Sequence, residues 1–176
     1  KEIQNRTTLI IPVFCGIRKE TVYDTVPWLK DRAFEKIEQN IYKTGERERI
    51  VCRIINRLLY ELNIDSDISV LEQLLLYSPI LPFYNMFNVL YNSKYYLSSD
   101  LRLSCIELCN ILSLLNVVCN ILGVTNDEFK DVLFKLPFYI KKIALSESNC
   151  LNYDFIVVLK RSINYVALKL LQFLDS

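Results

Sequence analysis

The chain has 176 residues, enough for one domain or for one domain and a fragment. It carries 21 Lys and Arg against 20 Asp and Glu, and this balance argues against a dedicated nucleic-acid binder, which normally has a basic excess. There is no histidine, which excludes histidine-based acid–base catalysis, triads built on histidine and metal sites with histidine ligands. Three glycines cannot build a glycine-rich phosphate loop.

The first predicted element is a strand from Thr8 to Phe14. This run is continuously apolar, which is typical of a strand buried on both faces of a parallel sheet. Pro12 has no backbone N–H and therefore favours an edge position or a bulge. A lone strand is not stable, and no later segment has the pattern of a partner strand. We therefore expect the rest of a sheet to precede Lys1.

Helical patterns follow this strand. The segment from Arg18 to Val26 predicts a short helix or turn that ends at Pro27. After a polar stretch, apolar residues recur every three or four positions from Ile50 to Leu62, which predicts an amphipathic helix. A polar linker over residues 63–67 then leads into a region, 68–176, in which every pattern is helical.

The helical region contains a weak internal duplication. Leu81-Pro-Phe-Tyr84 recurs as Leu136-Pro-Phe-Tyr139, and each copy continues with a short helix, a polar turn and a long apolar helix. The long helices are expected at 101–122 and 155–174. These features predict two helix-loop-helix units whose apolar stripes face each other. Coincidence in a chain rich in Leu and Tyr is the alternative.

The first long helix approaches the length of a membrane span. Its apolar run contains Arg102, Glu107 and three asparagines, so we expect a buried helix and no membrane association. Gly123 is a natural C-terminal stop for this helix.

The six cysteines do not form a recognisable metal or redox motif. No C-x-x-C pair occurs, and Cys105 and Cys109, four residues apart on one helix face, lack the second half of a metal site. Core packing is the preferred interpretation. No signal peptide is visible, and we expect a reduced, cytoplasmic protein.

The residues selected as a candidate interaction surface lie in two groups. Arg49, Arg53 and Arg57 are four apart and form a basic stripe that can bind phosphates or the acidic surface of a partner. The alternative is a solvated helix face on which Glu61 pairs with Arg57.

The second group begins at the only tryptophan of the sequence. Trp28, Asp31 and Arg32 form either the rim of a site or a local salt bridge. No pattern predicts a catalytic residue or a metal ligand.

Residues 8–62 resemble the C-terminal part of a TIR (Toll/interleukin-1 receptor) domain of the bacterial type. The matching features are the strand Thr8–Phe14, Gly16-Ile17, the segment Trp28-Leu-Lys-Asp-Arg32 and the helix Arg49–Leu59. The resemblance implies a flavodoxin-like fold with a central parallel sheet, in a family of signalling modules that assemble through their own surfaces. Many bacterial and plant members cleave NAD⁺ in immune or anti-phage responses.

The resemblance assigns no catalytic residue to this chain. In the enzymatic members the catalytic glutamate lies on a helix before the matching strand, and that region would precede Lys1. NAD⁺ is therefore implied as a substrate of a longer protein, with no bound cofactor.

The sequence as a whole predicts a mainly α-helical protein. We expect a C-terminal βα remnant of a TIR-like domain in residues 1–63 and a helical oligomerisation or regulatory domain in residues 68–176, forming a homo-oligomer or binding a protein partner. A non-enzymatic helical adaptor is the alternative. A Bcl-2-like bundle around the helix 101–122, binding a partner helix in a groove, ranks last because the Asn-Trp-Gly-Arg signature is missing.

Overall fold

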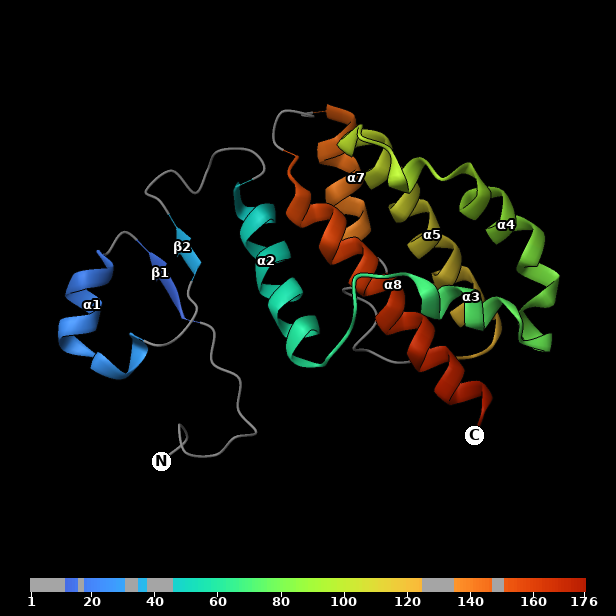
Figure 1. Ribbon diagram of the computed structural model, residues 1–176, viewed down its shortest axis with the longest axis horizontal. Helices are drawn as coiled ribbons and strands as arrows, with labels where there is room; N and C mark the ends of the chain where they lie inside the picture. Colours follow the sequence, from blue (N-terminus) through green and yellow to red (C-terminus); the bar gives the residue numbers. More distant parts are fainter. Residues whose placement is uncertain (1–11, 16–17, 31–34, 38–45, 125–134, 147–150) are drawn as a thin grey trace.

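The computed structural model describes residues 12–15, 18–30, 35–37, 46–124, 135–146 and 151–176. Among these residues the fold is mainly helical, with a helical bundle at one end and a small strand-containing unit at the other (Figure 1). The sequence also predicts a helix capping box at residues 125–128 and a helix N-cap at Thr44, and both positions lie outside the described residues.

The N-terminal unit consists of two short parallel strands joined by a helix. Its elements are β1 (Val13–Cys15), α1 (Lys19–Thr25), the 3-10 turn η2 (Pro27–Leu29) and β2 (Glu35–Ile37). Val13 pairs with Glu35 and Cys15 with Ile37 in parallel register. The predicted strand is confirmed over its last residues. The expectation that no later segment pairs with it is wrong, since β2 does so. The sequence did not reveal β2 because three residues, two of them charged, are too few and too polar for a recognisable strand pattern.

Helix α2 (Glu46–Glu61) lies between the β1–α1–β2 unit and α8 (Tyr153–Leu174) (Figure 1). It contacts β2 on one side and packs along α8 on the other. Cys52 of α2 is buried in the same hydrophobic cluster as the helices that follow. The core therefore continues across the boundary expected at residues 64–67.

The bundle is formed by α2 and the helices that follow the polar linker. In chain order these are α3 (Ser69–Leu75), the 3-10 turn η3 (Ser78–Phe83), α4 (Tyr84–Ser93), the turn η4 (Tyr95–Leu97), α5 (Leu101–Ile121), α7 (Leu136–Ser146) and α8. Helix α8 contacts α5, α2 and α3, and α5 also contacts α7 and η4. The two long helices predicted from the sequence are thus the central pair of the bundle.

The core lies between α5 and α8. Leu108, Leu112 and Leu115 of α5 are fully buried, as are Leu159 and Ile163 of α8. Each such side chain contributes about 1.5–3 kcal/mol relative to an exposed position. The interface between α5 and α8 is therefore a principal source of stability.

Both ends of α5 are set by local sequence. The Asp100 carboxylate caps the N-terminus by accepting hydrogen bonds from the backbone N–H groups of Arg102 (2.9 Å) and Leu103 (3.3 Å). At the other end Gly123 has φ +70°, and the Val124 N–H donates to the Cys119 carbonyl at 2.9 Å. This is the Schellman arrangement, and the predicted stop at Gly123 is confirmed.

Helix α2 ends in the same way, with a residue other than glycine. Asn63 has φ +57°, its N–H donates to the Tyr60 carbonyl, and the Ile64 N–H donates to the Leu59 carbonyl at 3.0 Å. Asparagine tolerates the left-handed region better than most residues. The linker that follows α2 thus begins with a defined turn.

Helix α5 is the one helix in the described part of the chain that is long and apolar enough to cross a membrane. In the structure it is a core helix, with buried residues from Ser104 to Cys119 and contacts with α7, α8 and η4. The prediction of a buried helix is confirmed.

Candidate interaction surface and groove

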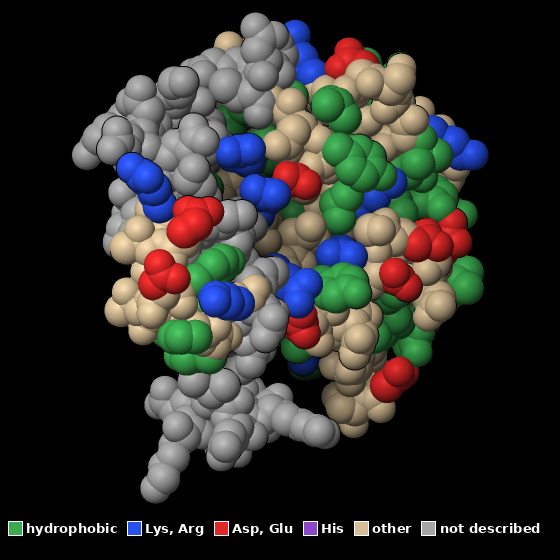
Figure 2. All heavy atoms as spheres, turned by 60° about the vertical axis from the view of Figure 1, so that its left-hand side comes forward, with side chains coloured by type: hydrophobic (Ala, Val, Ile, Leu, Met, Phe, Trp, Pro, Cys, Tyr) green, Lys and Arg blue, Asp and Glu red, His purple; other side chains and the backbone are tan. Residues whose placement is uncertain are grey.

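The predicted basic stripe on α2 is engaged in ion pairs. Arg53 Nε lies 3.5 Å from a carboxylate oxygen of Asp154 in α8, and Arg57 Nη2 lies 2.5 Å from Glu61 Oε1. The expected Arg57–Glu61 pair is thus present, and the Arg57 guanidinium also lies over the Tyr60 ring. Arg49 is half-buried. On the face shown in Figure 2, Lys and Arg are interspersed with Asp and Glu, so no large surface of one charge is formed there.

A polar connection between α2 and α8 was not predicted from the sequence. Arg161 of α8 donates from Nη1 to Asn56 Oδ1 at 2.7 Å and lies over the Tyr60 ring, 5.1 Å from its centre. A cation over an aromatic face and a charge-assisted hydrogen bond both stabilise this contact. Arg161 therefore fixes the C-terminal half of α2 against α8.

The linker after α2 is held by a buried amide. Asn164 of α8 is 2% exposed and donates from Nδ2 to the backbone carbonyls of Asp65, at 2.9 Å, and Asp67. The two hydrogen bonds are partly buried, and they also satisfy a side-chain amide that is itself buried. The only signal in the sequence was an asparagine in the apolar pattern of α8, which does not identify a partner.

The second predicted group lies in the N-terminal unit. Trp28 is in η2 and is exposed over 41% of its surface. Asp31 and Arg32 lie outside the described residues. Trp28 and the α2 arginines are thus carried by different elements, and their role as an interaction surface stays a prediction.

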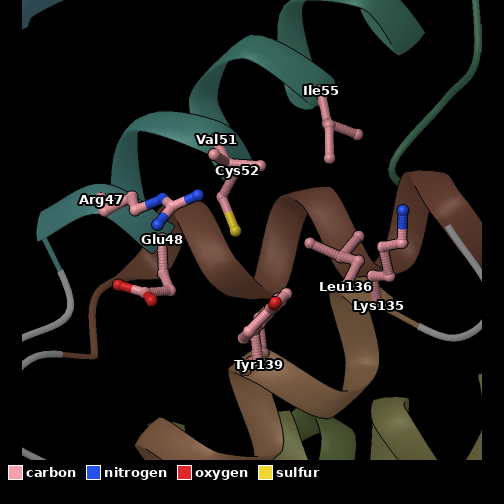
Figure 3. Close-up of a pocket in the computed structure, with 9 residues that line it drawn as sticks. Arg47, Glu48, Val51, Cys52, Ile55, Lys135, Leu136 and Tyr139 are labelled. Atoms are coloured by element: carbon pink, nitrogen blue, oxygen red, sulfur yellow. The ribbon is translucent and has the colours of Figure 1, made fainter. Parts of the chain in front are cut away.

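A groove opens between α2 and α7 (Figure 3). Its volume is about 390 Å³. The apolar lining comes from Val51, Cys52 and Ile55 of α2 and from Leu136, Tyr139 and Ile140 at the start of α7. Arg47, Glu48 and Lys135 supply its charged groups. The amphipathic pattern of α2 predicted that one of its faces is apolar. It did not predict that α7 would cover this face only in part.

The thiol at this groove is not a nucleophile near neutral pH. Burial raises the pKa of Cys52 far above its ordinary value, and the nearby Cys105 and Glu48 raise it further. Burial likewise raises the pKa of Cys105 to about 12 and that of Cys119 to about 11. Cys105 and Cys109 are fully buried in the core, which confirms the core-packing interpretation. These cysteines are inert, apolar groups in the folded protein.

Exposed apolar side chains are concentrated in the segment from α3 to η4. Leu76 is 80% exposed and Val89 of α4 is 72% exposed. The remaining large apolar side chains exposed in this segment are Leu81, Tyr84, Met86, Tyr95 and Leu97. We call these residues the 76–97 surface. Exposed apolar side chains mark an interaction surface where they form a contiguous patch, and this segment is the candidate that the exposures indicate.

No group of three or more Cys, Asp or Glu residues that could hold a metal ion occurs among the described residues. Asp154 and Glu61 lie in ion pairs, Asp100 caps α5, and Glu72 and Asp175 each accept a hydrogen bond from a tyrosine hydroxyl. The arrangement offers binding surfaces and no assembled acid–base pair in this part of the chain.

No family model, no curated protein and no solved structure matches this chain.

Proposed function

We propose that the chain is the C-terminal portion of a TIR-type immune or anti-phage signalling effector, in which the helical region mediates self-assembly. The order strand, helix, strand, helix in β1, α1, β2 and α2 is that of the end of a doubly wound βα layer. The observation that carries the proposal is the parallel pairing of β1 with β2, since parallel neighbours need a crossover and are characteristic of such sheets.

The helical region supplies the assembly surface in this proposal. The 76–97 surface exposes Leu76, Met86 and Val89 to solvent, and Phe87 is the one buried residue of α4. A second copy of the chain would remove these side chains from water, at about 25 cal/mol per Å² of apolar surface. Signalling by assembly would follow from this contact.

The internal duplication belongs to the same proposal. The string Leu81–Tyr84 leads into α4, whereas Leu136–Tyr139 begins α7, and each short helix is followed by a long one, α5 or α8. The two long helices face each other in the bundle. We infer that both halves derive from one helix-loop-helix unit.

NAD⁺ consumption by the complete gene product tests the proposal. We expect turnover that is lost in Val89→Glu, which places a charge on the 76–97 surface, and retained in Leu145→Glu, which places the same charge on an exposed apolar position of α7. Absence of turnover under every activating condition would contradict the TIR-type assignment.

A non-enzymatic helical adaptor is the second candidate. It is favoured by the state of the cysteines at Cys52, Cys105, Cys109 and Cys119, which are buried and whose raised pKa values keep the thiols protonated. An adaptor predicts self-association or partner binding without NAD⁺ loss, so the same assay separates the two candidates.

A further inference from the structure

The groove between α2 and α7 has the dimensions of a small-molecule site. Its volume of about 390 Å³ falls at the lower end of the range of roughly 300–1,000 Å³ that is typical of ligand pockets. At about 30 Å³ for each water-sized group, it accommodates roughly a dozen heavy atoms.

The lining of the groove is suited to an apolar body. Val51, Ile55, Leu136 and Ile140 present aliphatic side chains, and Figure 3 shows Ile55 and Leu136 directed toward each other across it. The Cys52 thiol, which burial keeps protonated, adds a further weakly polar group. A ligand rich in hydrogen-bonding groups would lose its water there without gaining partners.

The charges at the groove favour an anion. Among the described lining residues Arg47 and Lys135 are cationic, and Glu48 is the only carboxylate. Figure 3 shows the Arg47 guanidinium extending toward the Cys52 thiol, whereas the Glu48 carboxylate points away from Ile55 and Leu136. A guanidinium binds a carboxylate through two parallel hydrogen bonds, which fits a single anionic group above an apolar floor.

We propose that the α2–α7 groove binds a single-chain amphiphile with an anionic head, of the size of a medium-chain carboxylate. The chain lies on Val51, Ile55, Leu136 and Ile140, and the head is held by Arg47. This site is independent of the self-assembly proposed above, because none of its lining residues belongs to the 76–97 surface.

Calorimetric titration with decanoate, below its micellar concentration and at pH 7.5, tests the proposal. We expect one decanoate to bind to each chain. Decanol, the neutral counterpart, is expected to bind about tenfold more weakly, because it lacks the charge-assisted contact with Arg47. Arg47→Gln is expected to abolish the preference for decanoate while leaving decanol binding unchanged.

A matched pair of variants locates the site. Val51→Trp fills the groove from an exposed position and is expected to abolish binding of both ligands, whereas Leu58→Trp, on the same helix but outside the groove, is expected to retain it. Circular dichroism and the midpoint of urea unfolding verify that both variants are folded. Val89→Glu is expected to bind decanoate normally, which separates this site from the assembly surface.

The proposal would be overturned by no binding of decanoate, by equal affinities for decanoate and decanol, or by binding that persists in folded Val51→Trp. Saturation of the groove by an amphipathic peptide but not by decanoate would also overturn it and would indicate a helix-binding groove instead.

Discussion

The side-chain amide of Asn164 donates a hydrogen bond of 2.9 Å to the backbone carbonyl of Asp65, which is 99 residues earlier in the chain. A second hydrogen bond from the same nitrogen reaches the Asp67 carbonyl. Through this one buried side chain, α8 positions the linker that joins α2 to α3. The packing of α2 against the bundle therefore depends on a polar contact as well as on apolar burial.

Replacing Asn164 by Ala is expected to lower the free energy of unfolding by about 1–3 kcal/mol, because two backbone carbonyls lose their donor at a partly buried contact. Urea unfolding followed by circular dichroism measures this change. Asn92→Ala is the control, since its exposed amide donates only to Asn88 on the same helix and its loss is expected to cost less than about 0.5 kcal/mol. Equal costs for the two variants would contradict the role assigned to Asn164.

Replacing Leu112 by Ala is expected to cost about 2–5 kcal/mol, because it opens a cavity between the two central helices. Val117→Ala, at a largely exposed position on the same helix, is expected to change stability by less than about 0.5 kcal/mol. Thermal unfolding in a calorimeter compares the two. A small effect at Leu112 would show that α5 is not the core helix.

Replacing Gly123 by Ala tests backbone conformation alone. No atom lies within 4 Å of the position that a Cβ would take, so the expected cost of about 1–2 kcal/mol arises from the positive φ. Gly123→Asn is expected to cost less, since asparagine occupies the equivalent position at the end of α2, where Asn63 has φ +57°. Chemical unfolding of both variants provides the comparison, and an order with Asn less stable than Ala would contradict the Schellman assignment.

The buried cysteines predict a specific dependence on pH. Burial raises the pKa of Cys119 to about 11 and that of Cys105 to about 12, against an ordinary value of 9.0. Each of these thiols has a higher pKa in the folded protein than in the unfolded chain. The stabilisation that this difference provides is fully present below pH 9, the unfolded value, and is lost as the pH rises toward the pKa of the folded protein. Urea midpoints are therefore expected to fall between pH 8 and pH 10, and to fall less in Cys119→Ala. A larger fall in that variant would contradict this account.

The elements predicted from the sequence are those whose signal is local. The spacing of apolar residues identified α2, α5 and α8, and the spacing of four residues identified the Arg57–Glu61 pair. Strand β2 was missed because three residues carry no periodicity. A strand this short is defined by its partner rather than by its own composition.

The features that create the candidate sites are tertiary and leave no pattern in the sequence. Arg161 reaches Asn56 across 105 residues, and the α2–α7 groove exists because Val51 of α2 and Tyr139 of α7 line the same space. No spacing rule relates such positions in a single sequence. The 76–97 surface was equally hidden, because the sequence pattern does not separate an exposed apolar residue such as Val89 from a buried one such as Phe87.

Self-association through the 76–97 surface is the claim on which the proposed function depends, and sedimentation velocity over a range of protein concentrations measures it most directly. Our account predicts that the sedimentation coefficient of the wild-type chain rises with concentration, that Val89→Glu sediments as a monomer throughout, and that Leu145→Glu behaves like the wild type. A wild-type chain that stays monomeric at every concentration, or a Val89→Glu variant that still associates, would contradict it.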